Sequence, residues 1–383
     1  MDSVADEKCI MIAKIIKANL FILSCVCLVA CHTQIPATSV NYEQVDRIDD
    51  FLKYIEFIDV VPLQNDGEHY IGANPELLVS EDSYIVADMF NMHIYRYSKE
   101  GNYLNQIGMK GNGPAEFLTI DNIQLLPDGI LNVFSQSGKV ISYDIAGDFL
   151  TETLLEDYGG QGYYVDNGYL VYYGDGVGRG YRISHDKGKS RKTFLTATDK
   201  VLHYTSDSPV FSLNYDESIS IVDSYNPVIY RYSNGQVSEY LEFDFNETAV
   251  PSEYYEQESP FAAADFLLTR DFSIIRRYFE NEEYKFVEIF TNHPTSMPTF
   301  TYGMSYGDQW FWFATGRVDE KPLTASFRTI DADNVLYAII DPMLLDDCQP
   351  EILKLIRERS KLEMINHDDN YLIFKIKLKP QIK

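Results

Sequence analysis

Three aspartates end equivalent strand-like segments of this 383-residue chain, and carboxylates placed in this way could do chemistry. Asp88 ends the segment Ile-Val-Ala-Asp, Asp223 ends Ser-Ile-Val-Asp, and Asp341 ends Ala-Ile-Ile-Asp. If these segments repeat around one axis, the carboxylates could gather in a central channel and bind a cation such as Ca²⁺, or serve a hydrolase or lyase as general acid and base. The alternative is that each carboxylate accepts N–H groups of the following turn. The repetition favours this alternative, because a catalytic pair usually breaks a repeat.

Trp310 and Trp312 suggest a second kind of binding chemistry. They alternate with Phe311 and Phe313, so on a strand the two tryptophans share one face and the two phenylalanines share the other. A paired tryptophan face could stack on the rings of a sugar, although packing against a neighbouring sheet is the commoner role of such residues.

Other catalytic patterns are missing from the sequence. The histidines are scattered without HxH or HExxH spacing, no Ser-His-Asp set can be assembled, and there is no CxxC pair. Four of the five cysteines lie within the first 31 residues, so Cys348 has no cysteine partner in the rest of the chain. The glycine-rich segment 108–117 lacks the GxxxxGK[ST] pattern of a phosphate loop, and we interpret it as a sharp turn. The sequence therefore predicts no cofactor, with calcium as an option only if the aspartates meet.

The residues that must position these groups have the pattern of repeated antiparallel strands. Residues 83–104 contain Tyr-, Ile- and Val-rich segments separated by polar bends, as paired strands require. The pentapeptide Ile-Tyr-Arg-Tyr-Ser occurs at residues 94–98 and again at 229–233. Turn glycines mark the repeats at Gly101, Gly147, Gly188 and Gly235. Their spacings of 46, 41 and 47 residues suit one four-stranded sheet per repeat, which predicts an all-β, six-bladed β-propeller.

Two segments depart from the strand pattern and predict helices. Residues 253–278 predict a short helical insertion between blades, because apolar side chains recur there at helical spacing, at Phe261, Ala264, Leu268, Phe272 and Ile275. Residues 351–364 predict an amphipathic C-terminal helix, which precedes a last strand at residues 371–378. Because an open ring would leave unpaired strand edges, we expect the N-terminal strand or the last strand to close the propeller.

The first 31 residues have the pattern of a lipoprotein signal peptide. Basic residues precede an apolar run that is too short to span a membrane, and the run ends in Leu-Val-Ala-Cys at residues 28–31, which resembles a bacterial lipobox. Cleavage before Cys31 would make it the lipidated N-terminus. We therefore expect a lipid anchor at Cys31, a flexible tether over residues 32–50 and the propeller over residues 51–383.

The residues after Cys31 bear on which membrane would hold the anchor. The next residue is His32 rather than Asp, so the inner-membrane retention signal of enteric bacteria is absent. The acidic tetrad that exports some lipoproteins to the cell surface is also missing from residues 32–36. We expect an outer-membrane lipoprotein that faces the periplasm, with display on the cell surface as the alternative.

Composition narrows the classes of partner. The formal net charge is −26, which argues against binding to nucleic acid or to anionic lipid surfaces. Hydrophobic residues make up 45% and aromatic residues 14% of the chain, enough for the large core of a propeller.

Four features together resemble the six-bladed β-propeller lipoproteins of gut Bacteroidota, distant relatives of the NHL-repeat propellers. They are the lipobox leader followed by a strand that ends in VPLQ, the first repeat with IVADMFNMHIYRYS, the loop GMKGNGPAEF, and the ending DDNYLIFKIKLK after a short helix. The loop is the most specific of these, and it carries Ala115 where the family commonly has glycine. The resemblance implies a propeller fold and a place in the cell envelope, and it carries over no catalytic residue.

Two functions remain open at this point. The first is a non-enzymatic binding or scaffold module for a glycan, a peptide or an envelope protein, which the lack of a catalytic constellation favours. The second is a hydrolase or lyase that uses carboxylates of the central channel, with calcium as an option.

Overall fold

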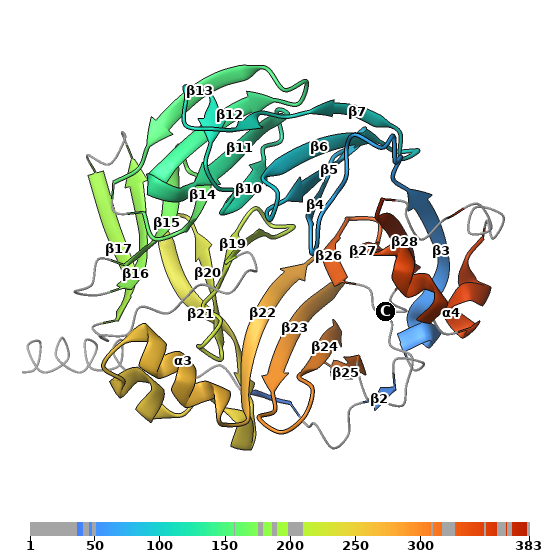
Figure 1. The fold of residues 1–383 in the computed structure, drawn as a ribbon. Helices are drawn as coiled ribbons and strands as arrows, with labels where there is room; N and C mark the ends of the chain where they lie inside the picture. The colour runs from blue at the N-terminus through green and yellow to red at the C-terminus, as the bar shows by residue number, and fades with distance from the viewer. Residues whose placement is uncertain are drawn as a thin grey trace, which may run out of the picture. The chain divides into compact units, whose positions relative to one another are not determined.

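Six sheets surround a central axis in the part of the chain that the structure describes (Figure 1). The structure is a computed structural model that describes residues 37–40, 46–47, 51–156, 158–174, 179–185, 190–197, 210–307, 309–315, 326–347, 350–357, 365 and 370–380. The predicted all-β, six-bladed propeller is confirmed. Cys31, Gly188 and Cys348 lie outside the described residues.

The first three blades each contain four antiparallel strands, which follow one another in sequence from the axis outward. Blade 1 contains β4 (Glu76–Val79), β5 (Ser83–Asp88), β6 (His93–Ser98) and β7 (Tyr103–Gln106). Blade 2 contains β10 (Asn122–Leu125), β11 (Ile130–Ser135), β12 (Lys139–Asp144) and β13 (Phe149–Leu154). Blade 3 contains β14 (Gln161–Val165), β15 (Gly168–Gly174), β16 (Arg179–His185) and β17 (Ser190–Ala197).

The other three blades follow the same order, with additions at their outer edges. Blade 4 contains β18 (Phe211–Leu213), β19 (Ile219–Val222), β20 (Val228–Ser233) and β21 (Gln236–Asp244). Blade 5 contains β22 (Phe272–Glu280), β23 (Tyr284–Asn292), β24 (Thr299–Tyr306) and β25 (Gln309–Thr315). Blade 6 contains β26 (Ser326–Ile330), β27 (Val335–Ile340), β28 (Leu372–Leu378) and, outermost, β3 (Ile55–Pro62).

Blade 6 joins the two ends of the chain and so closes the ring. The early strand β3 pairs antiparallel with the late strand β28, from Pro62 opposite Leu372 to Ile55 opposite Leu378, and Figure 1 shows the two side by side in blue and red. On β28, Lys375 and Lys377 are partly exposed, whereas the apolar residues are buried. The prediction that an end strand closes the ring is confirmed, and strands from both ends take part.

Parts of the segment predicted as a tether belong to the fold. β1 (Thr38–Ser39) pairs parallel with β21, and β2 (Asp46–Arg47) pairs parallel with β25. These short strands cover the outer edges of blades 4 and 5, which would otherwise present unpaired backbone groups. The propeller fold therefore begins before residue 51.

The repeated pentapeptide forms the third strand of blades 1 and 4. Its isoleucines, Ile94 and Ile229, are fully buried. Gly101 follows it in the turn to the fourth strand with a φ of +90°, and a Cβ atom there would lie 2.0 Å from the carbonyl oxygen of Pro62. Glycine is required at this turn, because any side chain would be strained and would collide with blade 6.

The helical insertion is shorter than the sequence predicted. η6 (Ser252–Glu256) and α3 (Pro260–Leu268) form it, with Ser259 as the N-cap that accepts the N–H of Ala262 at 3.2 Å. Phe272 and Ile275, which were predicted to continue the helix, lie on strand β22. The prediction was wrong there because a short apolar run fits both helical and strand periodicity, and pairing with β23 decides for the strand.

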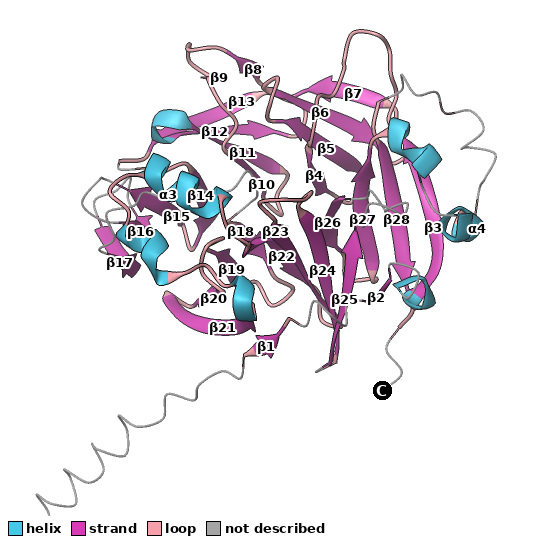
Figure 2. Cartoon of the chain, turned by 60° about the horizontal axis from the view of Figure 1, so that its bottom comes forward, coloured by secondary structure: helices cyan, strands magenta, loops and turns pink. Residues whose placement is uncertain are grey.

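The predicted C-terminal helix is present as α4 (Pro350–Leu355). It ends before Ile356, which forms an isolated parallel bridge with Ile58 of β3. The described part of the chain also contains the short 3-10 helices η2 (Leu52–Tyr54), η3 (Gln136–Gly138), η5 (Asn246–Thr248) and η7 (Pro342–Asp347). Figure 2 shows these helices as short segments at the margins of a body made of strands. No described helix is long and apolar enough to cross a membrane.

The glycine-rich segment 108–117 forms a small ribbon between blades 1 and 2. β8 (Met109–Lys110) pairs parallel with β9 (Glu116–Phe117), and Glu116 Oε2 accepts the N–H of Gly113 at 2.7 Å. Ala115 has a φ of +60°, a conformation that favours glycine. A glycine at this position would adopt this conformation without strain.

Candidate functional site

A cavity of about 330 Å³ runs through the centre of the propeller. The first strands of all six blades line it, and they bring apolar side chains together with a few polar ones. Its polar lining residues include Glu76, Asn122, Gln124, Ser212, Arg277 and Arg328. A cavity of this size is in the range that holds small molecules in other proteins.

A buried ion pair spans the cavity wall between blades 1 and 5. Arg277 of β22 donates from Nη1 to Glu76 Oε1 at 2.7 Å and from Nη2 to Glu76 Oε2 at 2.9 Å. Arg277 is 5% and Glu76 is 8% exposed. Two parallel hydrogen bonds between ionised groups form one of the strongest polar contacts in proteins, so this pair holds the two blades in register.

Arg328 of β26 lies beside this pair and is held by uncharged groups. Its Nε donates to the carbonyl oxygen of Pro75 at 3.1 Å, and its Nη2 donates to the same oxygen and to Asn74 Oδ1, both at 2.9 Å. Its Nη1 donates to Ser326 Oγ at 2.5 Å. The nearest carboxylate contact joins Arg328 Nε and Glu76 Oε2 at 3.9 Å, beyond hydrogen-bond distance.

Glu288 of β23 is the second carboxylate near the pair. Its Oε2 lies 3.8 Å from Arg277 Nε, and its Oε1 lies 3.6 Å from Arg276 Nη1. Three guanidinium groups, on Arg276, Arg277 and Arg328, therefore face two carboxylates in this channel cluster. Among the described residues, the cluster carries an excess of positive charge.

The pKa shifts follow from this balance. Burial raises the pKa of Glu76, but the charges of Arg277 and Arg328 outweigh burial, so the pKa lies below its ordinary value. Burial and the neighbouring charge of Arg277 lower the pKa of Arg328 to about 10. Glu76 is therefore a carboxylate at neutral pH, suited to hold charge rather than to donate a proton.

The predicted aspartates all lie at the same end of the propeller but outside the described lining of the cavity. Asp88 is fully buried and accepts four hydrogen bonds. The donors are the N–H groups of Gly72, Phe90 and Asn91, at 2.6, 3.0 and 2.8 Å, and Asn91 Nδ2 at 2.8 Å. In this position Asp88 organises the bend after β5.

Asp341 and Asp223 occupy equivalent places after the second strands of their blades. Asp341 Oδ1 accepts the N–H of Met343 at 2.9 Å, and the carbonyl oxygen of Asp223 accepts the N–H of Asn226 at 2.7 Å. Within the described part of the chain, no three His, Cys, Asp or Glu side chains are arranged to hold a metal ion.

The two predicted tryptophans lie between blades 4 and 5. Their rings stack with centroids 5.7 Å apart and an interplanar angle of 17°. Phe243 of β21 meets Trp310 and Trp312 edge-on, with centroids 5.3 and 6.0 Å apart. Trp312 is 8% exposed, so its ring is committed to this packing.

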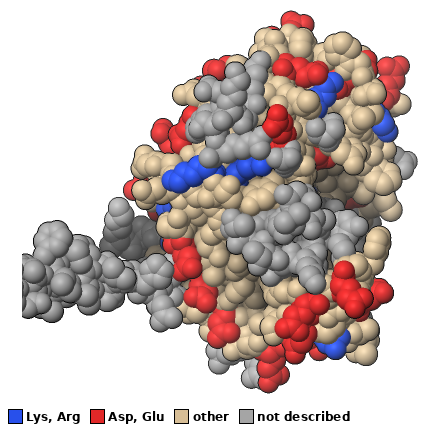
Figure 3. Space-filling model, turned by 90° about the vertical axis from the view of Figure 1, so that its left-hand side faces the viewer, with Lys and Arg blue, Asp and Glu red and all other residues tan. Residues whose placement is uncertain are grey.

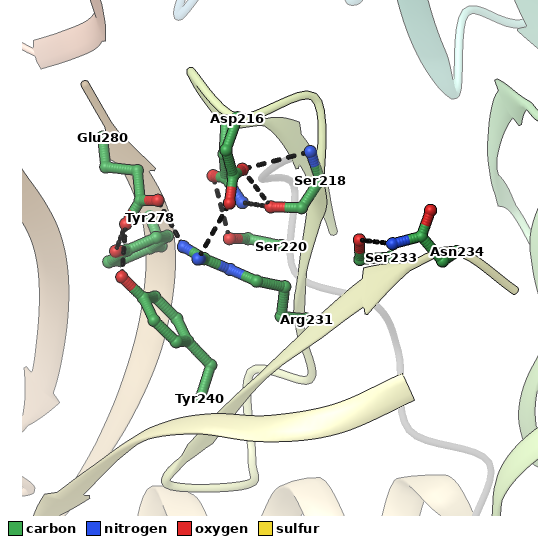
Figure 4. Close-up of polar contacts among 10 residues, drawn as sticks. Asp216, Ser218, Ser220, Arg231, Ser233, Asn234, Tyr240, Tyr278 and Glu280 are labelled. Atoms are coloured by element: carbon green, nitrogen blue, oxygen red, sulfur yellow. Dashed lines mark hydrogen bonds and ion pairs between the residues drawn. The ribbon is translucent and has the colours of Figure 1, made fainter. Parts of the chain in front are cut away.

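A second buried ionic cluster, the junction cluster, also lies between blades 4 and 5 (Figure 4). Glu280 of β22 accepts hydrogen bonds from Arg231 Nη2, from Tyr278 Oη and, at 2.9 Å, from Tyr240 Oη. The side chain of Glu280 is fully buried, and the guanidinium of Arg231 lies 3.5 Å over the Tyr240 ring. Burial and the charge of Glu280 raise the pKa of Tyr278 well above its ordinary value, which keeps the phenol protonated.

Exposed apolar side chains gather at one end of the propeller. Connections alternate between the two ends because neighbouring strands in each blade are antiparallel. We call the mouth face the end with the connections that lead into the first strands and those between the second and third strands. Eight large apolar residues on its described connections are 48–79% exposed: Tyr70, Phe90, Met109, Leu118, Phe261, Leu268, Met297 and Met343. On the described connections at the opposite face, Tyr215 is the single comparable residue.

Sequence reasoning missed both buried ionic clusters. A usable signal was the placement of charged residues inside otherwise apolar strands, as in Phe-Ser-Ile-Ile-Arg-Arg-Tyr-Phe-Glu at residues 272–280. Assigning Ile275 and its neighbours to a helix hid that signal. The partners could not be found from the sequence, because Glu76 and Arg277 are 201 residues apart.

Solved structures similar to this chain include two from Bacteroides and one from Staphylococcus. One, described as an exported protein of Bacteroides fragilis, has a TM-score of 0.69 and 17% identity, covering 90% of this chain and 98% of that chain. A member of the DUF4221 family from Bacteroides vulgatus has a TM-score of 0.54 and 8% identity, covering 85% and 97%. A virginiamycin B lyase from Staphylococcus aureus has a TM-score of 0.42 and 10% identity, covering 83% and 99%. At their low identities the two Bacteroides structures show the fold alone.

The sequence comparisons are more specific. No curated protein matches the chain. One family matches residues 33–377 of the 383 residues. The chain therefore belongs to the family described as a domain of unknown function, DUF4934.

Proposed function

We propose that the propeller is a non-enzymatic binding module of the bacterial cell envelope, which recognises a glycan, a peptide or a protein partner on its mouth face. The observation that carries this proposal is the gathering of exposed apolar side chains on the connections of that face. Exposed apolar groups that are concentrated in one region mark interaction sites more often than scattered ones do. Loops held by a rigid scaffold are also the usual place for recognition residues.

The position in the envelope rests on the leader and on the structural neighbour. The lipobox-like residues 28–31 support a lipid anchor at Cys31, and the similar Bacteroides fragilis structure is described as an exported protein. An outer-membrane anchor with the propeller in the periplasm fits these observations, and display on the cell surface is the alternative. Nucleic acid is not expected as a partner, because the formal net charge is −26.

The geometry favours binding over hydrolysis or elimination. The carboxylate of Glu76 is occupied by the fork of Arg277, and its lowered pKa makes it a poor proton donor. The carboxylate of Asp88 accepts three hydrogen bonds from its own turn and a fourth from the N–H of Gly72. Nothing in the described part of the chain singles out the hydrolase or lyase alternative.

The test compares two faces of the full-length protein in Bacteroides cells. Chemical cross-linking followed by mass spectrometry is applied to the wild type, to the mouth-face double variant Phe90→Ser and Phe261→Ser, and to the opposite-face control Tyr215→Ser. We expect the wild type and the control to capture the same envelope components and the double variant to lose them. Equal capture by all three proteins would refute the proposal.

A further inference from the structure

The channel cluster has more positive charge than its described partners balance. Arg277 and Arg328 are both buried, and Glu76 is the carboxylate that contacts both of them. Glu288 lies 3.8 Å from Arg277 Nε and is shared with Arg276, so it forms no hydrogen bond at that distance. A buried charge without a close counter-charge is costly, unless a ligand or solvent balances it.

Unused donors point to the same place. Arg277 Nε is buried and has no hydrogen-bond partner among the described residues, although Arg277 is 95% buried. Ser212 Oγ, on the wall formed by β18, is also buried without a described partner. Both residues line the cavity, where an occupant could satisfy them. Buried polar atoms are rarely left without a partner in folded proteins.

The cavity has the size and the walls of a small-molecule site. Its volume is about 330 Å³. Apolar side chains such as Ile123, Phe211 and Ile330 cover much of its wall. The charged groups of Glu76, Arg277 and Arg328 lie on β4, β22 and β26. A few polar groups on an apolar wall orient a ligand, while the apolar wall supplies contact area.

The charge of the channel cluster differs from that of the molecular surface, and this difference bears on the charge of the ligand. Asp and Glu are spread over the side of the molecule shown in Figure 3, and the formal net charge of the chain is −26. An acidic molecule is therefore repelled by the exterior in general, and the channel cluster is a local exception. Arg328 is locked by Asn74, Pro75 and Ser326, so its charge is fixed in position before any ligand arrives.

We propose that the channel cluster binds the carboxylate of a small acidic molecule, with Arg277 and Arg328 supplying the positive charge and Ser212 a hydrogen bond. A uronic acid and an acidic amino acid or peptide end share this chemistry. This site lies inside the ring, so the inference is independent of what the apolar side chains of the mouth face bind.

The experiment is calorimetric titration of the purified full chain in detergent with matched acid and neutral compounds. Galacturonate is compared with galactose, and glutamate with glutamine. We expect at least one acid to bind about tenfold more tightly than its neutral counterpart, and the preference to shrink as salt is added. A preference for galacturonate assigns the carboxylate to a sugar, and a preference for glutamate assigns it to a peptide or amino acid. Equal binding of each pair, or no binding by any of the four, would overturn the proposal.

Variants locate the site. Arg328→Met removes the surplus charge but leaves the Arg277–Glu76 pair, and we expect it to abolish the preference for the acid. Arg328→Lys keeps the charge and is expected to retain part of the preference, which guards against loss of fold as the explanation. Arg231→Met, in the junction cluster, is the matched control and should bind like the wild type. Unchanged preference in a folded Arg328→Met protein would place the binding elsewhere and refute the assignment.

Discussion

Two buried carboxylate–guanidinium clusters meet the same strand, β22, yet they are balanced in different ways. In the junction cluster, Glu280 is surrounded by Arg231 and by two phenols that donate to it. In the channel cluster, Arg277 donates hydrogen bonds to Glu76, whereas Arg328 donates to uncharged acceptors. The first cluster joins two blades, and its arginine pairs with two carboxylates, Glu280 and Asp216, although Arg231 Nε has no hydrogen-bond partner among the described residues. The second cluster carries an excess of positive charge among the described residues and faces a cavity. It is therefore the better candidate for binding a ligand.

The repeated pentapeptide sharpens the lesson. Arg96 and Arg231 occupy the same position in the two copies of Ile-Tyr-Arg-Tyr-Ser. Arg96 Nη2 pairs with Asp82 Oδ2 at 2.9 Å, and the side chain of Asp82 is 66% exposed. Arg231 makes the corresponding contact, since its Nη1 lies 3.3 Å from Asp216 Oδ2, but its Nη2 also pairs with the fully buried Glu280, which the next blade supplies. Identical local sequence therefore produces a similar surface contact in both blades, and a buried junction is added where the neighbouring blade supplies Glu280.

The largest expected effect is loss of the guanidinium that satisfies Glu76. Arg277→Met leaves a buried carboxylate without its two hydrogen bonds and should lower the free energy of unfolding by about 3–5 kcal/mol. Urea denaturation measures the difference. Arg276→Met, whose side chain is 22% exposed, is the matched control and should cost about 1 kcal/mol or less. Similar losses in the free energy of unfolding would show that the Arg277–Glu76 pair stabilises the fold no more than the contact of Arg276 does.

The second effect separates the two partners of the repeated arginine. Glu280→Gln keeps the shape of the side chain but removes the charge that Arg231 needs, so we expect a loss of about 2–3 kcal/mol in the free energy of unfolding. Asp82→Asn removes the surface partner of Arg96 and should cost about 0–1 kcal/mol. The same urea titration compares them, and a larger loss for Asp82→Asn would reverse the contrast between the blades.

The third effect tests whether the phenols complete the junction cluster. Tyr278→Phe removes one donor to Glu280 and should destabilise the protein by about 1–2 kcal/mol. The effect should largely vanish in a Glu280→Gln background, because the charged acceptor is then gone. A double-mutant cycle measures this coupling. Additive losses would mean that Tyr278 acts through packing alone.

The smallest expected effect concerns Asp121, a carboxylate that belongs to neither cluster. It shows what burial does to the pKa of a carboxyl group. Burial raises the pKa of Asp121 to about 6 from its ordinary value of 3.8. Between these values the folded protein binds more protons than the unfolded chain, so this group lowers stability as pH rises. Asp121→Asn should therefore raise the free energy of unfolding at pH 8 by about 1–2 kcal/mol, which a higher melting temperature would reveal. The gain should disappear near pH 4. A gain that persists at pH 4 would contradict the assignment.

The fold could be predicted from the sequence because its signals are local. Turn glycines such as Gly101, the strand alternation and the repeated pentapeptide each act within a few residues, and together they define a blade. The position of Asp88 at the end of a strand was also predicted from the sequence. Its two possible roles were a carboxylate of the central channel and an acceptor for the N–H groups of the turn. Local periodicity failed at residues 272–278, where pairing with the neighbouring strand overrides it.

The candidate site could not be predicted because its members meet only in three dimensions. Glu76, Arg277 and Arg328 come from three blades, and each looks like an isolated charge in its own segment. Which arginine would be balanced depends on neighbours that the sequence does not place next to it. Arg96 and Arg231 make the point most clearly, since the letters around them are the same.

The pairing of β3 with β28 has a consequence for how the protein is made. Among the described strands of the blades, β3 is synthesised first and its partner β28 last. The ring therefore cannot close while the chain is still emerging, and β3 must wait for about the time that the rest of the propeller takes to be produced. A chain cut short before Leu372 would carry an open blade with the bare edge of β27. A closed ring can therefore form only in chains that include the last strand.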